Sequence, residues 1–70
     1  MKEETLQLIH DEAMVCASLI KEYGPDRKYE WKLNGYLKCM WDLGYISYAE
    51  STKIERYYRA YFNELKMRRN

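Results

Sequence analysis

The stretch Leu43-Gly44-Tyr45-Ile46-Ser47-Tyr48-Ala49-Glu50-Ser51-Thr52 combines the end of one helix with the start of the next. Glycine takes the left-handed conformation that ends a helix without steric cost, so Gly44 predicts a helix end. Ser47 followed three residues later by Glu50 matches the capping box, in which two side chains satisfy backbone donors of a new first turn. The short link between these two signals predicts a helical hairpin.

On both sides of this hairpin, apolar side chains recur every three or four residues, which is the period of one helix face. The helix after the turn is predicted over residues 48–67, with Phe62 on one flank of its inward face. The inward residues of this helix are Ser51, Ile54, Tyr58, Tyr61 and Leu65. The helix before the turn is predicted over residues 27–43, with Asp26 as its cap. Its core residues are Tyr29, Leu33, Tyr36, Leu37, Met40 and Leu43.

A further helix is predicted over residues 3–23, ended by Gly24-Pro25. Its core residues are Leu6, Ile9, Ala13, Cys16, Ala17 and Ile20. Both connections are short, so neighbouring helices should run antiparallel. The 70 residues are 47% hydrophobic and 16% aromatic, which is typical of a folded chain near the lower size limit for one domain. The expected fold is all-α, a compact antiparallel three-helix bundle formed by one domain, residues 1–70.

Charge and cysteine content narrow the class of protein. Residues 1–26 carry two basic and six acidic side chains, whereas residues 27–70 carry ten basic and five acidic ones. Two cysteines, Cys16 and Cys39, are too few for a secreted disulfide framework, and we expect two buried, reduced thiols. Met1-Lys2-Glu3-Glu4 lacks the layout of a signal peptide, and no apolar run approaches the roughly 20 residues that span a bilayer. We expect a cytoplasmic protein that does not bind membranes.

The residues that carry common catalytic chemistry are sparse. His10 is the one histidine, and no serine or cysteine motif provides it with a recognisable nucleophile. No glycine-rich phosphate loop is present. Cys16, Cys39 and His10 match no standard zinc spacing and lack a fourth ligand. We therefore expect no enzymatic activity, no cofactor and no metal.

Opposite its core side, the third helix presents a polar strip with a spacing of 4, 3, 4 and 3 residues. The strip consists of Thr52, Arg56, Arg59, Asn63 and Lys66, with Lys53 and Tyr57 near one edge. One interpretation is a solvated face stabilised by pairs such as Glu55 with Arg59. The other is a surface that meets phosphates or an acidic protein.

Trp31 projects away from the core side of the second helix, near Gly35 and Lys38. Tryptophan is enriched among the residues that anchor interfaces. The alternative is that Trp31 folds back over Tyr23 and the Gly24-Pro25 loop. The predicted partner-binding residues are therefore Trp31, Lys38, Lys53, Arg56, Tyr57, Arg59, Asn63 and Lys66.

The first helix carries a second apolar line formed by Leu8, Val15 and Leu19, with Glu12 between them. If this helix contacts both others, the whole apolar arc is used in the core. Otherwise the line is an exposed seam with acidic neighbours, suited to self-association, and a homodimer is then expected.

The segments Trp31-Lys32-Leu33-Asn34-Gly35-Tyr36-Leu37 and 43–50 resemble a pattern found in small helical proteins of bacteriophages and other mobile elements. The resemblance implies an accessory protein of such an element, a class that includes inhibitors of host nucleases such as anti-CRISPR proteins. The leading expectation is thus a module that binds a protein, for example an enzyme acting on nucleic acid.

Direct nucleic-acid binding through the third helix is the alternative, and a self-assembling module is a third possibility. A helix-turn-helix arrangement is disfavoured, because Glu50 and Lys53 occupy positions where it needs buried aliphatic side chains.

Overall fold

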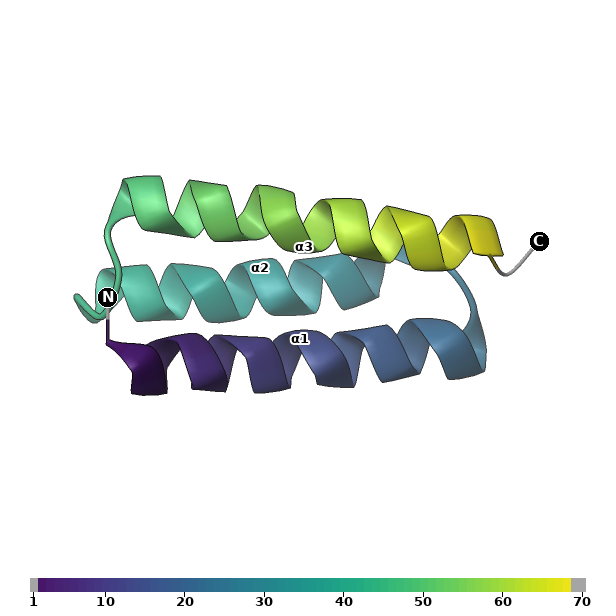
Figure 1. The fold of residues 1–70 in the computed structure, drawn as a ribbon, viewed down its shortest axis with the longest axis horizontal. Helices are drawn as coiled ribbons and strands as arrows, with labels where there is room; N and C mark the ends of the chain where they lie inside the picture. Colours follow the sequence, from purple (N-terminus) through teal and green to yellow (C-terminus); the bar gives the residue numbers. More distant parts are fainter. Residues whose placement is uncertain (1, 69–70) are drawn as a thin grey trace.

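Three helices form the part of the chain that the computed structural model describes, residues 2–68. They are α1 (Glu3–Tyr23), α2 (Arg27–Asp42) and α3 (Tyr48–Arg68). Neighbouring helices run antiparallel and lie side by side along their length (Figure 1). Each helix contacts both others, and the rod measures 38 × 19 × 17 Å. The predicted three-helix bundle is confirmed, with α2 ending one residue earlier and α3 one residue later than expected.

The α2–α3 turn has the geometry that its glycine predicts. Gly44 has φ 83°, in the left-handed region. Its N–H donates to the carbonyl of Trp41 at 3.0 Å, and the N–H of Tyr45 donates to the carbonyl of Met40 at 2.9 Å. These bonds satisfy carbonyls that would otherwise be left free at the end of α2.

The start of α3 is the predicted capping box. The N–H of Glu50 donates to Oγ of Ser47 at 3.1 Å, and the N–H of Ser47 donates to Oε1 of Glu50 at 2.8 Å. The latter bond lowers the pKa of the Glu50 carboxyl, because the backbone donor favours the charged form. The turn between α2 and α3 is therefore fixed from both sides.

The α1–α2 connection follows the same logic. Gly24 has φ 100°, and its N–H donates to the carbonyl of Ile20 at 2.9 Å. Two residues on, Oδ1 of Asp26 accepts from the N–H of Lys28 at 3.0 Å and caps α2. Both predicted end signals are confirmed.

Gly44 and Gly35 provide a matched test of the turn. A Cβ added at Gly44 or at Gly35 meets no atom within 4 Å, so an alanine at either site differs only in backbone conformation. We expect Gly44→Ala to lower the free energy of unfolding by about 1–2 kcal/mol, since the left-handed conformation strains a residue with a Cβ. Gly35→Ala, inside α2, should raise it by about 0.5–1 kcal/mol. Urea denaturation measures both, and shifts of the same sign would contradict the assigned turn.

The core is formed by side chains from all three helices and the α2–α3 turn. The buried apolar residues are Ile9, Ala13, Cys16, Ala17, Ile20, Tyr29, Leu33, Leu37, Met40, Ile46, Tyr58 and Phe62. Most of the predicted core of α1 and α2 is confirmed. On α3, however, Tyr58 and Phe62 are the buried residues, whereas Ser51, Ile54, Tyr61 and Leu65 are only partly buried.

Three predictions about the core are wrong. Leu6 is almost half exposed, because α1 turns Thr5 inward in its place. Leu43 is 72% exposed, because α2 ends one residue before it and Ile46 from the turn covers that end of the core. Phe62, predicted on a flank, is only 1% exposed and is among the largest fully buried side chains.

Among the described residues, none of the three helices is long and apolar enough to cross a membrane.

Candidate macromolecule-binding face

Four of the predicted partner-binding side chains lie together in a shallow hollow between α2 and α3. The hollow has a volume of ≈ 390 Å³ and is lined by Arg27, Glu30, Trp31, Arg59, Asn63 and Lys66. Trp31 is 65% exposed, so it lies open beside the polar side chains of α3 and is not covered by the α1–α2 loop. Tryptophan and arginine are the residues most enriched at the energetic centres of protein interfaces.

A second tryptophan lies on the same side of α2, nearer the α2–α3 turn. The ring centroids of Trp41 and of Tyr48 on α3 are 5.1 Å apart. Nζ of Lys38 lies 5.8 Å from the Trp41 ring centroid. We call the hollow and this aromatic pair together the α2/α3 face: Arg27, Glu30, Trp31, Lys38, Trp41, Tyr48, Arg59, Asn63 and Lys66.

Carboxylates balance much of the positive charge on this face. Nζ of Lys66 donates to Oε1 of Glu30 at 2.6 Å across the helix pair, and both side chains are partly buried. Arg59 pairs with Glu55, one turn earlier on α3. Within residues 2–68, Arg27 and Arg56 form no ion pair. The cationic strip predicted along α3 therefore carries less free charge than its sequence indicates.

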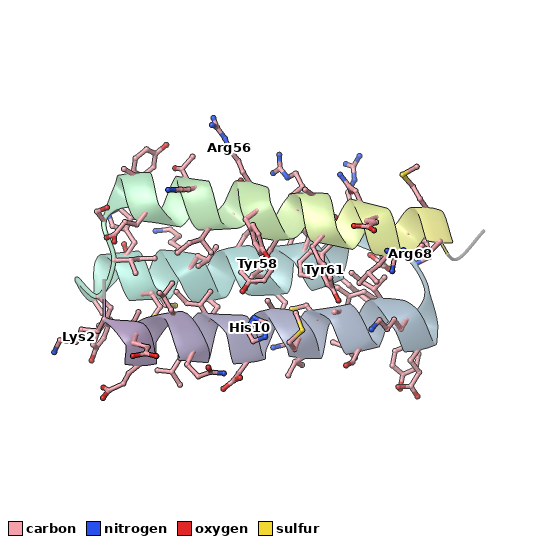
Figure 2. All side chains as sticks on the ribbon, viewed as in Figure 1. Lys2, His10, Arg56, Tyr58, Tyr61 and Arg68 are labelled. Carbon is pink, nitrogen blue, oxygen red and sulfur yellow. The ribbon has the colours of Figure 1, made fainter. Side chains whose placement is uncertain are left out.

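The remaining predicted partner-binding residues lie outside this face. Arg56 points away from the bundle (Figure 2). Lys53 and Tyr57 line an apolar groove of ≈ 440 Å³ between α1 and α3, which we call the α1/α3 groove; its other lining residues are Leu6, Ile9, Ile54 and Tyr58. Seven of the eight predicted residues thus lie in two hollows or on the ridge between them, and Lys38 lies beside Trp41 on α2.

A histidine–tyrosine contact joins α1 to α3 beside this groove. Nδ1 of His10 and the hydroxyl oxygen of Tyr58 are 3.1 Å apart, and both side chains lie between the two helices in Figure 2. Burial raises the pKa of Tyr58, so its phenol stays protonated at neutral pH and can donate to His10. Sequence reasoning missed this pair because its members are 48 positions apart.

The predicted seam on α1 is only partly exposed. Leu8 and Val15 are about half exposed, whereas Leu19 packs against the core. Glu12, between them, pairs with Lys32 of α2, and this bond raises the pKa of Lys32. Leu19 therefore belongs to the core, as the first interpretation expects, whereas Leu8 and Val15 form a shorter exposed seam, as the second expects.

The two cysteines differ in exposure, so the prediction that both are buried is wrong for one of them. Cys16 and Cys39 are free thiols, and Cys16 is buried while Cys39 is exposed on α2. Burial raises the pKa of Cys16, which makes its thiolate rare at neutral pH. Among the described residues, no group of three or more His, Cys, Asp or Glu side chains is placed to hold a metal ion.

Arg27 and Trp41 of the α2/α3 face were not predicted from the sequence. They follow the same spacing that defined the polar strip on α3. Arg27, Trp31, Asn34, Lys38 and Trp41 have the spacing 4, 3, 4 and 3, which defines one line along a helix. Applying this spacing to α2 would have added Arg27 and Trp41 to the prediction.

Comparison with protein-family models, curated proteins and solved structures finds no match to this chain. Function is therefore inferred from the geometry and charge of the two hollows.

Proposed function

We propose that this protein is a non-enzymatic module that binds another protein through the α2/α3 face. The observation that carries the proposal is the exposure of Trp31 inside a hollow that also holds Arg27 and Arg59. A tryptophan in such a place offers a large apolar surface with little conformational entropy to lose, and the surrounding polar groups can form a rim. Trp41 and Tyr48 extend this aromatic surface toward the turn.

The ion pairs favour a protein over a nucleic acid as the partner. Binding to a phosphate backbone depends on several free cations that release counterions. On the α2/α3 face, Lys66 and Arg59 are already paired with Glu30 and Glu55, whose carboxylates would repel phosphates. A protein surface with scattered acidic groups could form an ion pair with Arg27 and leave these existing pairs intact.

A more specific form of the proposal is an inhibitor from a phage or another mobile element that acts on a host nuclease. Its support is the sequence resemblance of residues 31–37 and 43–50. Because Arg27 forms no ion pair within residues 2–68, the nuclease surface that this face fits would place an acidic group opposite Arg27.

Affinity capture with matched variants tests the proposal. Tagged wild-type protein, Trp31→Ala and Tyr23→Ala are compared in a bacterial lysate; Tyr23 is a similarly exposed aromatic residue outside the α2/α3 face. We expect a partner that the wild type and Tyr23→Ala retain equally and that Trp31→Ala binds roughly 30-fold more weakly, as for a central interface anchor. Equal capture by all three proteins would contradict the proposal.

A gel shift with non-specific DNA and RNA tests the nucleic-acid alternative. At about 150 mM salt we expect no binding tighter than about 10⁻⁶ M. Sub-micromolar binding that the double substitution Arg56→Ala and Arg59→Ala abolishes would instead identify a nucleic-acid-binding protein.

A further inference from the structure

Exposed apolar side chains gather at one end of the rod, where α2 turns into α3. Four exposed side chains lie within the eight residues 41–48 that include this turn: Trp41, Leu43, Tyr45 and Tyr48. The N-terminal ends of α1 and α3 lie at the same end (Figure 1). Clustered exposed apolar surface on a small soluble domain marks an interaction site.

The turn presents two of these side chains as a rigid knob. Leu43 and Tyr45 flank Gly44, and both are more than half exposed. Ile46, directly after them, is buried and anchors the turn in the core. The hydrogen bonds at the end of α2 and the capping box of α3 hold the backbone on either side. A preorganised knob loses little entropy when it binds.

The α1/α3 groove, toward the same end, has the complementary shape and chemistry. It is concave, its volume is ≈ 440 Å³, and Leu6, Ile54 and Tyr57 contribute apolar lining. Lys53 stands among the lining residues and forms no ion pair within residues 2–68. Asp42 lies next to the knob, and its one ion pair in this range is with Lys38 at 3.3 Å, between exposed side chains. Knob and groove therefore carry opposite charges beside apolar surfaces.

We propose that a second copy of this chain is the occupant of the α1/α3 groove. In a two-fold dimer, the Leu43-Gly44-Tyr45 knob of each copy enters the groove of the other, and Asp42 of each copy meets Lys53 of the other. One chain carries both halves of the contact toward one end, so a single two-fold axis satisfies both at once. The contact covers apolar surface that a 70-residue chain cannot bury alone. Trp31 and the hollow around it stay open in this dimer, whereas Trp41 and Tyr48, at the other end of the α2/α3 face, lie close to the knob.

Sedimentation equilibrium of the full chain from 1 to about 100 μM, with charge-swap variants, tests the dimer; concentrations of this order detect interfaces of modest size. We expect a wild-type dimer whose dissociation constant rises at least tenfold in Leu43→Glu, Lys53→Glu and Asp42→Lys. Lysine at the end of α2 suits the helix dipole, so Asp42→Lys should stay folded; circular dichroism verifies each variant. The double variant, Asp42→Lys with Lys53→Glu, should dimerise within about threefold of wild type, because it restores opposite charges.

Leu8→Glu and Val15→Glu, at the exposed positions of the seam of α1, serve as controls that should leave the dimer intact. A monomeric wild type at the highest concentration overturns the proposal, as does a double variant that stays monomeric. Loss of the dimer in Leu8→Glu with retention in Leu43→Glu would place the interface on α1 instead. Trp31→Ala should dimerise normally, which separates this test from that of the partner site.

Discussion

Replacing Phe62 with alanine should lower the free energy of unfolding by about 3–5 kcal/mol, the largest effect that we expect from a single truncation in this chain. Phe62 is 1% exposed and lies among the rings of Tyr58 and Tyr61, at centroid distances of 6.3 and 6.0 Å. Truncation removes this burial and leaves a cavity that three tightly packed helices fill only in part. A 70-residue domain has a total stability of about 4–10 kcal/mol. The variant should therefore be close to unfolding at room temperature.

Urea denaturation followed by circular dichroism measures this loss, with Met67→Ala as the control. Met67 is on the same helix but exposed, so its truncation should change stability by less than about 0.5 kcal/mol. A Phe62→Ala protein with the midpoint of wild type would mean that this side chain is not in the core.

The helices and their ends are predictable from sequence because their signals are local. Gly44, Ser47 and Glu50 act within one turn of backbone, and the same holds for Gly24 and Asp26. Their hydrogen bonds require only the conformation of a few neighbouring residues. Short connections then leave an antiparallel bundle as the natural arrangement.

The exact inward side of each helix is less predictable, because apolar periodicity defines a broad arc and not the rotation of the helix within it. Thr5 replaces Leu6 and Phe62 takes the central place on α3 once the helices pack together. Ile9 on α1 and Tyr58 on α3 stay buried as predicted, so neither helix turns a different side to the core; the changes are between neighbouring positions of the same arc. Which of these neighbours is covered depends on contacts between distant segments.

In the candidate site too, local features could be predicted from the sequence and contacts between distant segments could not. The exposure of Trp31 and Arg59 could be predicted from their position opposite the core stripe of each helix. The pairing of Lys66 with Glu30 could not, because it depends on the register between α2 and α3 over 36 positions. This register decides how much free positive charge the face retains, and thus which class of partner it favours.

The same substitution, leucine to alanine, at Leu33 and at Leu43 tests whether a position in the apolar stripe is in fact packed in the core. Both belong to the apolar stripe predicted for α2, yet Leu33 is 1% exposed and Leu43 is 72% exposed. Leu33→Ala should lower the free energy of unfolding by about 2–5 kcal/mol, through lost burial and a residual cavity. Leu43→Ala should cost less than about 0.5 kcal/mol in the monomer, since it removes side-chain atoms that water already surrounds.

Urea denaturation at several protein concentrations provides the measurement. The loss in Leu33→Ala should not depend on concentration, because it arises within one chain. For Leu43→Ala, any loss should fade on dilution, because a ligand or partner stabilises only in proportion to its occupancy. Equal, concentration-independent losses at the two sites would show that α2 continues through Leu43 and that both leucines lie in the core. In that case the end of α2 at Asp42 and the exposed knob would both be wrong.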